Sequence, residues 1–219
     1  MDKVDKIYPY KPNYEEIVNY YSDMPDIIFY KLKSWDEISS IDDLELSNRV
    51  KNELENCMQS TVGYAFYFKN KNYIFMTNDN VIYHEISHIV NRERLLDLFK
   101  INYDNLTINK INDRTEDEND FIFMDEFIAE YLSTKILKRS DKYDLLIYNL
   151  RTKRRIKFDE IDYYLGACAA IEDNIKITEK YKNLAKKILE CIIFNNYKVV
   201  DIDRGKIRDI KKHLKEYLH

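Results

Sequence analysis

Helical spacing of apolar residues dominates the chain, and two short β-rich runs interrupt it in the first half. Residues 44–57 carry apolar side chains close to helical spacing, which predicts a helix. The runs 61–68 and 72–77 are rich in aromatic and β-branched residues, and the three polar residues between them indicate a hairpin. A long helix is expected next, with Asp79 as its N-cap and its end near Phe99.

The second half is predicted to be mostly helical. Residues 100–120 are polar and acidic, and we expect a loop there. A second long helix should run from about 120 to 138. Further helical patterns cover residues 142–150, 158–174, 178–194 and 203–218. The expected fold class is therefore α+β and predominantly helical, with one small sheet.

Composition agrees with a helix-rich globular chain and excludes several classes of site. Only three glycines and three prolines occur among the 219 residues, so helix breakers are rare and no glycine-rich nucleotide loop can be spelled. The formal net charge of −4 argues against a dedicated nucleic-acid binder. Two basic clusters, 151–157 and 204–215, could touch nucleic acid or an acidic protein, or could be solvated helix faces.

Cysteine usage and the lack of long apolar stretches point to a reduced, aqueous compartment. The first residues contain no apolar signal-peptide core, and no stretch reaches the roughly 18 apolar residues of a membrane span. The three cysteines are far apart, with no CxxC pair, so neither a disulfide framework nor a thiolate zinc site is indicated. We expect a cytoplasmic location and no membrane partner; the sequence leaves the oligomeric state open.

One short motif has recognisable chemistry. Residues 84–88 read His-Glu-Ile-Ser-His, an HExxH pattern inside the first long helix. Positions four apart lie on one helix face, so the imidazoles of His84 and His88 can reach a single ion. Zinc suits two imidazoles, one carboxylate and an open fourth position. Glu85 would lie beside the ion, where it could hold and deprotonate a water.

The third ligand should be a carboxylate or a histidine on a neighbouring element. The extended motif HExxHxxGxxH is excluded, because Asn91 and Arg94 occupy its Gly and His positions. The best segment reads FMDEFIAEYLSTK, within the second long helix. It offers Glu126 and Glu130, which are one helical turn apart and face the same way.

At this segment the sequence resembles the gluzincin metallopeptidases, whose third zinc ligand is a Glu on a downstream helix. The run DEFIAEY, residues 125–131, is similar to the NEGFAEY of zinc aminopeptidases, and EFIAEYL is similar to the EFFAEAF of lethal-factor-type peptidases. Both alignments imply Glu126 as the ligand of one zinc ion per chain. By its likeness to the second acid of thermolysin-like enzymes, Glu130 would orient His84 or His88.

The resemblance also implies a mechanism and a way to hold substrate. Glu85 would take a proton from water as it attacks a peptide carbonyl, and would pass it to the leaving amine. The strand 72–77 would present an edge to an extended peptide. The GxMxN segment of aminopeptidases is missing, which favours an endopeptidase.

The oxyanion donor is the point at which this chain departs from the resemblance. Lethal-factor-type and thermolysin-like enzymes have a tyrosine seven to nine residues before the glutamate ligand, where this chain has Asn119 and Asp117. A donor would have to come from elsewhere. The candidates are Tyr103, Tyr163 and Tyr164.

The resulting hypothesis is one zincin-like domain over residues 1–219 that hydrolyses peptide bonds with zinc. Its core would span about 60–139, with a helical lead-in at 1–59 and a helical part at 140–219. The expected partner is a peptide or protein substrate. Two alternatives remain open: a non-catalytic binding or regulatory module on the same scaffold, and a regulatory protease that cuts a specific repressor.

Overall fold

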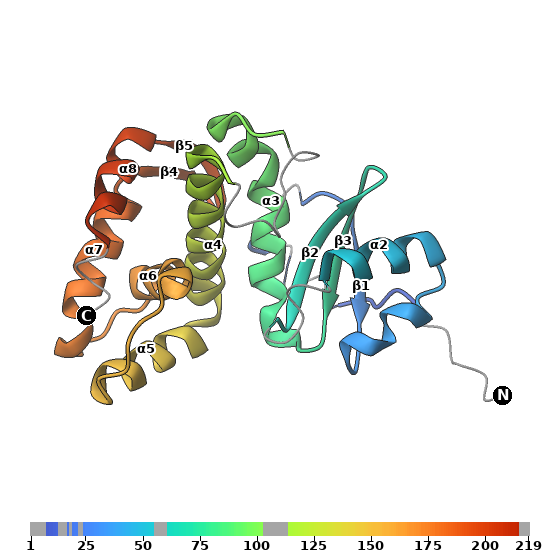
Figure 1. Ribbon diagram of the computed structural model, residues 1–219, viewed down its shortest axis with the longest axis horizontal. Coiled ribbons are helices and arrows are strands. Elements are labelled where there is room, and N and C mark those ends of the chain that lie inside the picture. Colours follow the sequence, from blue (N-terminus) through green and yellow to red (C-terminus); the bar gives the residue numbers. More distant parts are fainter. Residues whose placement is uncertain are drawn as a thin grey trace. The chain divides into compact units, whose positions relative to one another are not determined.

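The computed structural model describes residues 8–12, 17, 19–21, 24–54, 61–102 and 114–214, and its fold class is the expected α+β with mostly helical structure (Figure 1). The chain divides into two compact units. Unit 1 comprises residues 1–90 and 107–113, and unit 2 comprises residues 91–106 and 114–219. The division falls inside one helix, α3 (Ile82–Phe99), so the single domain remains a prediction.

Unit 1 contains a three-stranded mixed sheet with the strand order β1-β3-β2 (Figure 1). Its strands are β1 (Ile27–Lys31), β2 (Gly63–Phe68) and β3 (Lys71–Met76). β3 pairs parallel with β1 and antiparallel with β2. The prediction that residues 72–77 form an edge strand is therefore wrong. The apolar run Ile-Ile-Phe-Tyr of β1 was not expected as a strand, and it covers the side of β3 that would have been open.

The predicted hairpin between the two β-rich runs is confirmed. β2 and β3 are joined by a two-residue turn, Lys69-Asn70, and both residues have positive φ, 49° and 59°. That combination is typical of a type I′ turn, whose twist matches the twist of the flanking strands. Asparagine tolerates the left-handed conformation well.

A helical layer closes one face of this sheet. It consists of the short 3-10 helix η1 (Trp35–Ser40) and of α2 (Leu44–Leu54). Leu46, Val50 and Leu54 of α2 are fully buried at helical spacing. They share a hydrophobic cluster with Phe66 of β2 and Phe75 of β3. The helix predicted from residue 44 is confirmed as far as residue 54, and its remaining residues lie outside those described.

Unit 2 is built mainly from helices around one large hydrophobic cluster. None of the helices in the described ranges is both long and apolar enough to cross a membrane. In addition to the second half of α3, the helical elements are α4 (Glu116–Leu137), α5 (Asp141–Arg151), η5 (Phe158–Glu160), α6 (Ile161–Ala170), η6 (Lys176–Thr178), α7 (Glu179–Leu189) and α8 (Arg204–Lys212).

Helix α4 begins earlier than its charge pattern indicated. The acidic residues 116–120 were expected in a loop, but they form the first turn of the helix. Thr115 and Glu118 make a capping box, in which the Thr115 hydroxyl accepts from the Glu118 amide and the Glu118 carboxylate accepts from the Thr115 amide at 2.6 Å. Negative side chains also suit the positive end of the helix dipole. The acidic run is therefore a helix start.

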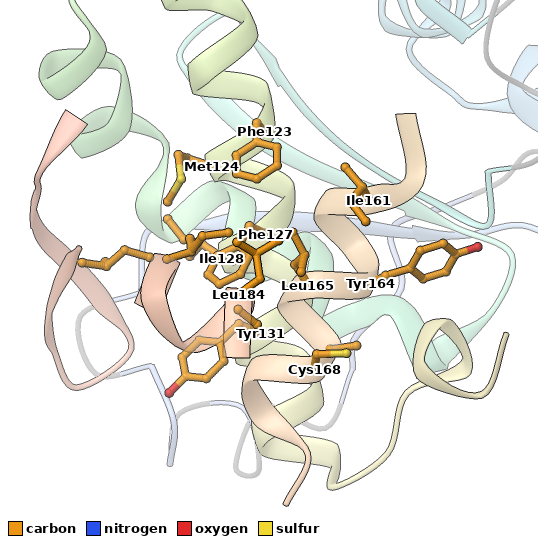
Figure 2. Close-up of a cluster of buried hydrophobic side chains, with 14 of the residues drawn as sticks. Phe123, Met124, Phe127, Ile128, Tyr131, Ile161, Tyr164, Leu165, Cys168 and Leu184 are labelled. Carbon is orange, nitrogen blue, oxygen red and sulfur yellow. The ribbon is translucent and has the colours of Figure 1, made fainter. Parts of the chain in front are cut away.

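The centre of unit 2 is the contact between α4 and α6. Figure 2 shows apolar side chains of α4, among them Phe127 and Tyr131, with Leu165 and Cys168 of α6. Gly166 allows the two backbones to approach closely. A Cβ atom on Gly166 would lie 2.5 Å from the carbonyl oxygen of Phe127. Gly166 is therefore a point of close packing between α4 and α6.

A second hairpin follows α7, where the helix predicted for residues 178–194 ends early. Its strands are β4 (Ile192–Asn195) and β5 (Lys198–Ile202), and they pair antiparallel. Asn91 of α3 binds the backbone of β5, because its Oδ1 accepts from the Val199 amide at 2.7 Å. The Arg94 Nε donates to the Val200 carbonyl at 2.7 Å. The two positions that exclude the extended zinc motif thus attach this hairpin to α3.

The basic face of α8 binds the acidic start of α4. Arg208 Nε lies 2.7 Å from Asp120 Oδ2, and Lys211 Nζ lies 2.5 Å from its Oδ1. Arg204 and Arg208 both pair with Asp117. The Asp120 side chain is only 3% exposed. The basic cluster 204–215 was considered as a solvated face or as a site for an external anionic partner. Part of it instead forms ion pairs with acidic residues of the same chain.

Candidate metal centre

The HExxH motif lies in the first two turns of α3. A short 3-10 helix, η2 (Asp79–Val81), leads into α3, and its cap is Asn78 rather than the expected Asp79. The Asn78 side chain accepts from the Asn80 amide at 3.0 Å. The rings of His84 and His88 lie one turn apart with their centroids separated by 4.7 Å. Both histidines are half-buried on the same helix face, as the spacing predicted.

Ile86 and Ser87, which lie between Glu85 and His88 in the sequence, anchor this turn. Ile86 is fully buried in the interior. The Ser87 hydroxyl donates to the Tyr83 carbonyl at 2.7 Å and lies 2.6 Å from the hydroxyl of Tyr21. Tyr21 is itself 1% exposed. These contacts fix the turn of α3 that connects the two histidines.

Glu85 is buried beside the first residue of β2. Its side chain is 6% exposed. A Cβ atom built on Gly63 would lie 2.6 Å from Glu85 Oε1 and 2.6 Å from Val81 Cγ2. The backbone of the edge strand therefore passes directly against the Glu85 carboxylate. Only a glycine leaves room for this approach without a shift of these side-chain ends, and its backbone φ is not positive, so the requirement is one of space.

Glu126 lies in the third turn of α4 and is half-buried. One ligand atom each from His84, His88 and Glu126 lies within 4.8 Å of the other two. The group could hold a metal ion. Two imidazole nitrogens and one carboxylate oxygen are a donor set that zinc accepts, with a fourth position left for water or substrate. These are the three residues that the sequence selected as ligands.

Glu130, the predicted orienting residue, is buried one turn further along α4. Its Oε1 accepts from Ser140 Oγ at 2.5 Å and from Thr134 Oγ1 at 3.2 Å. Ser140 is also the N-cap of α5, where its hydroxyl accepts from two backbone amides. Glu130 therefore connects α4 to the start of α5. Its proposed action on a zinc-binding histidine stays a prediction.

The tyrosines suggested as oxyanion donors occupy different environments. Tyr103 lies outside the described residues. Tyr164 is fully buried, and its hydroxyl donates to Glu160 Oε2 at 3.0 Å, so an oxyanion role would require that bond to break. Tyr163 is half-buried with Lys142 above its ring at 4.8 Å. The identity of the donor stays a prediction.

Two contributors to the site were not identified from the sequence. Gly63 had a signal, because it is one of three glycines and stands at the start of a β-rich run, a position that often marks a close backbone approach. The hydroxyl pair of Tyr21 and Ser87 joins residues 66 apart and has no local signature.

Comparisons with protein-family models, with curated proteins and with solved structures found no match.

Proposed function

We propose that the chain is a zinc-dependent peptidase. The observation that supports this most directly is the group of His84, His88 and Glu126, whose ligand atoms lie within 4.8 Å of one another. Glu85 adds a buried carboxylate between the two histidines in sequence, which is the position of a general base in HExxH enzymes. Neither feature alone would suffice, because exposed acids often cluster and HExxH occurs by chance.

Zinc and Glu85 would have separate roles in the proposed reaction. When bound, a zinc ion would polarise a substrate carbonyl and acidify water. Glu85 would accept the proton of the attacking water and deliver it to the leaving amine. Its burial keeps bulk water from competing for that proton, and the backbone at Gly63 limits the positions that the carboxylate can take.

The peptide substrate would be held by an edge strand. β2 has a single strand neighbour, β3, within the described part of the sheet, and its other edge is the one that we propose for backbone pairing with the peptide. Its first residue, Gly63, lies against the Glu85 carboxylate. An extended peptide paired with β2 would therefore run past the general base, and β2 replaces residues 72–77 as the proposed binding edge.

Metal content is the decisive first measurement. Elemental analysis of the wild type should give about one zinc per chain, and Glu126→Ala should lose it. Glu130→Ala serves as the matched control, since it removes a neighbouring carboxylate of the same helix that is outside the ligand group. Absence of zinc from the reconstituted wild type would refute the proposal.

Catalysis is tested separately with Glu85→Gln. This variant should keep its zinc and lose cleavage of a casein or denatured-protein substrate by at least about a hundredfold, because general-base catalysis contributes roughly that much or more. A protein that binds zinc and cleaves nothing would instead support the non-catalytic module on the same scaffold.

A further inference from the structure

Positive charge and exposed rings gather where α5 ends. The segment from residue 145 to 158 contains five Lys and Arg and no Asp or Glu, in a chain whose formal net charge is −4. We call the following residues the basic surface: Tyr148, Arg151, Lys153, Arg155, Lys157 and Phe158. All of them are exposed.

The backbone of the basic surface is fixed by hydrogen bonds and by one buried anchor. Lys153 adopts the left-handed conformation with φ 53°, and the Arg154 amide donates to the Asn149 carbonyl at 2.8 Å, which closes the helix end. Ile156 is only 2% exposed and fastens the segment that follows. Arg155 and Lys157 flank this anchor and project into solvent. The cations are thus presented by an ordered backbone.

The Lys and Arg side chains of the basic surface form few hydrogen bonds or ion pairs with other described residues. Within the described ranges, the side chains of Arg151, Lys153 and Arg155 make no hydrogen bond or ion pair. Among the described side chains, Lys157 pairs only with Glu160, at 3.7 Å and with 70% of its side chain exposed, and such a surface pair contributes little. The helix dipole favours cations in the last turn of α5, but its effect ends there. It does not account for Arg155 and Lys157.

Apolar side chains accompany the charges. Phe158 is 52% exposed and Tyr148 is 48% exposed, and the Arg154 guanidinium lies 5.1 Å from the Tyr148 ring centre. Leu145, one turn before Tyr148 on α5, is 41% exposed. A single exposed apolar residue needs no explanation. Aromatic residues beside arginines are the composition found at protein interfaces.

We propose that the basic surface docks an acidic polypeptide segment that also contains apolar side chains. Its carboxylates would pair with Arg151, Arg155 and Lys157, and its apolar groups would cover Tyr148 and Phe158. A polypeptide fits better than nucleic acid, since the net charge of −4 repels a long polyanion, whereas a short acidic segment meets only the local positive field. The proposal is independent of the peptidase function.

The test uses fluorescence anisotropy with the full-length protein. The probe is a labelled peptide in which Glu-Glu-Leu-Glu-Glu-Phe is repeated twice, and the control peptide has Gln in place of every Glu. Charge reversal by Arg151→Glu, Arg155→Glu and Lys157→Glu together should weaken binding at least about tenfold. High salt should weaken wild-type binding similarly. Tyr148→Ser with Phe158→Ser should weaken it through the apolar part of the contact.

A matched variant separates a defined surface from general charge. Reversal of three exposed lysines elsewhere in unit 2, by Lys176→Glu, Lys186→Glu and Lys187→Glu, changes net charge equally and should leave affinity within about twofold. Equal loss in both triple variants overturns the proposal, as does equal binding of the Gln peptide. Binding of a single-stranded oligonucleotide in place of the acidic peptide would also overturn it. Circular dichroism confirms that each variant is folded.

Discussion

Gly63 lies directly against the carboxylate of Glu85. No other residue type fits there without a shift, since a Cβ at position 63 would approach both Glu85 Oε1 and Val81 Cγ2 to 2.6 Å. Both of those atoms are side-chain ends and not backbone. The fold can therefore accommodate a methyl group by moving the Glu85 carboxylate, and that movement falls on the proposed general base.

Gly63→Ala should consequently lower activity while it preserves the fold and the metal. We expect cleavage to fall by roughly a hundredfold, because small displacements of a catalytic group have effects of this size. Zinc stoichiometry and the thermal midpoint should stay close to those of the wild type. Gly205→Ala is the control, as its Cβ would meet only Asp203 Oδ1 at an ordinary 3.5 Å. Unchanged cleavage in Gly63→Ala would show that the carboxylate tolerates the methyl group.

Gly166→Ala should act on stability. Here the added Cβ would lie 2.5 Å from the Phe127 carbonyl oxygen, a backbone atom that cannot move without separating α6 from α4. Overpacking of this kind costs about 1–3 kcal/mol of the free energy of unfolding. Urea denaturation monitored by circular dichroism measures the loss. Gly205→Ala again provides the comparison, and equal midpoints for the two variants would contradict the close approach.

Local patterns in the sequence predicted the elements that build the candidate site, but not all of their neighbours. The motif spacing placed His84 and His88 on one helix face, and helical periodicity placed Glu126 on a second helix. These features depend on residues close in sequence. The order β1-β3-β2 depends on pairing between residues 27–31 and 71–76, for which the chain contains no local signal.

Two elements were predicted wrongly although the sequence contained a signal for the correct structure. The acidic residues 116–120 suggested a loop, although Thr115 and Glu118 already had capping-box spacing. Residues 192–194 were assigned to the end of a helix, although Asn195 and Asn196 follow them and favour a turn. Asn196 adopts φ 56° in that turn. In both segments the residues that begin or end an element were more informative than its average polarity.

The buried carboxylate of Asp120 should be a stability determinant of unit 2. Its two oxygens face Arg208 and Lys211. Asp120→Asn would remove the carboxylate charge from Lys211 and would leave Arg208 with Asp117 and the more distant Glu116. We expect a loss of about 1–3 kcal/mol, below the value for a fully buried pair because the two cations are partly exposed. Glu116→Gln is the control, since Glu116 is 72% exposed and lies 3.9 Å from Arg208. Equal denaturation midpoints for the two variants would show that the Asp120 contacts contribute nothing.

The last prediction concerns the pH dependence that Asp173 gives to unit 2. Burial alone would raise the pKa of this carboxyl group, but hydrogen bonds from Lys182, from the Ile175 amide and from Tyr143 outweigh burial and hold the pKa below its ordinary value of 3.8. A carboxyl group with a depressed folded pKa stabilises the fold fully above its unfolded pKa. That contribution is lost as the pH falls through the folded pKa.

Asp173→Asn should therefore lower the free energy of unfolding at neutral pH by about 1–3 kcal/mol, the usual contribution of hydrogen bonds to a charged group. The difference between the variant and the wild type should persist down to about pH 4 and shrink below it. At low pH the Asp173 carboxyl group of the wild type is protonated in both the folded and the unfolded protein. Urea denaturation at a series of pH values from neutral to strongly acidic measures this difference directly. Glu172→Gln, an exposed neighbour, should show no such convergence. A difference that stays constant through the acidic range would assign the loss to packing and not to the charge of Asp173.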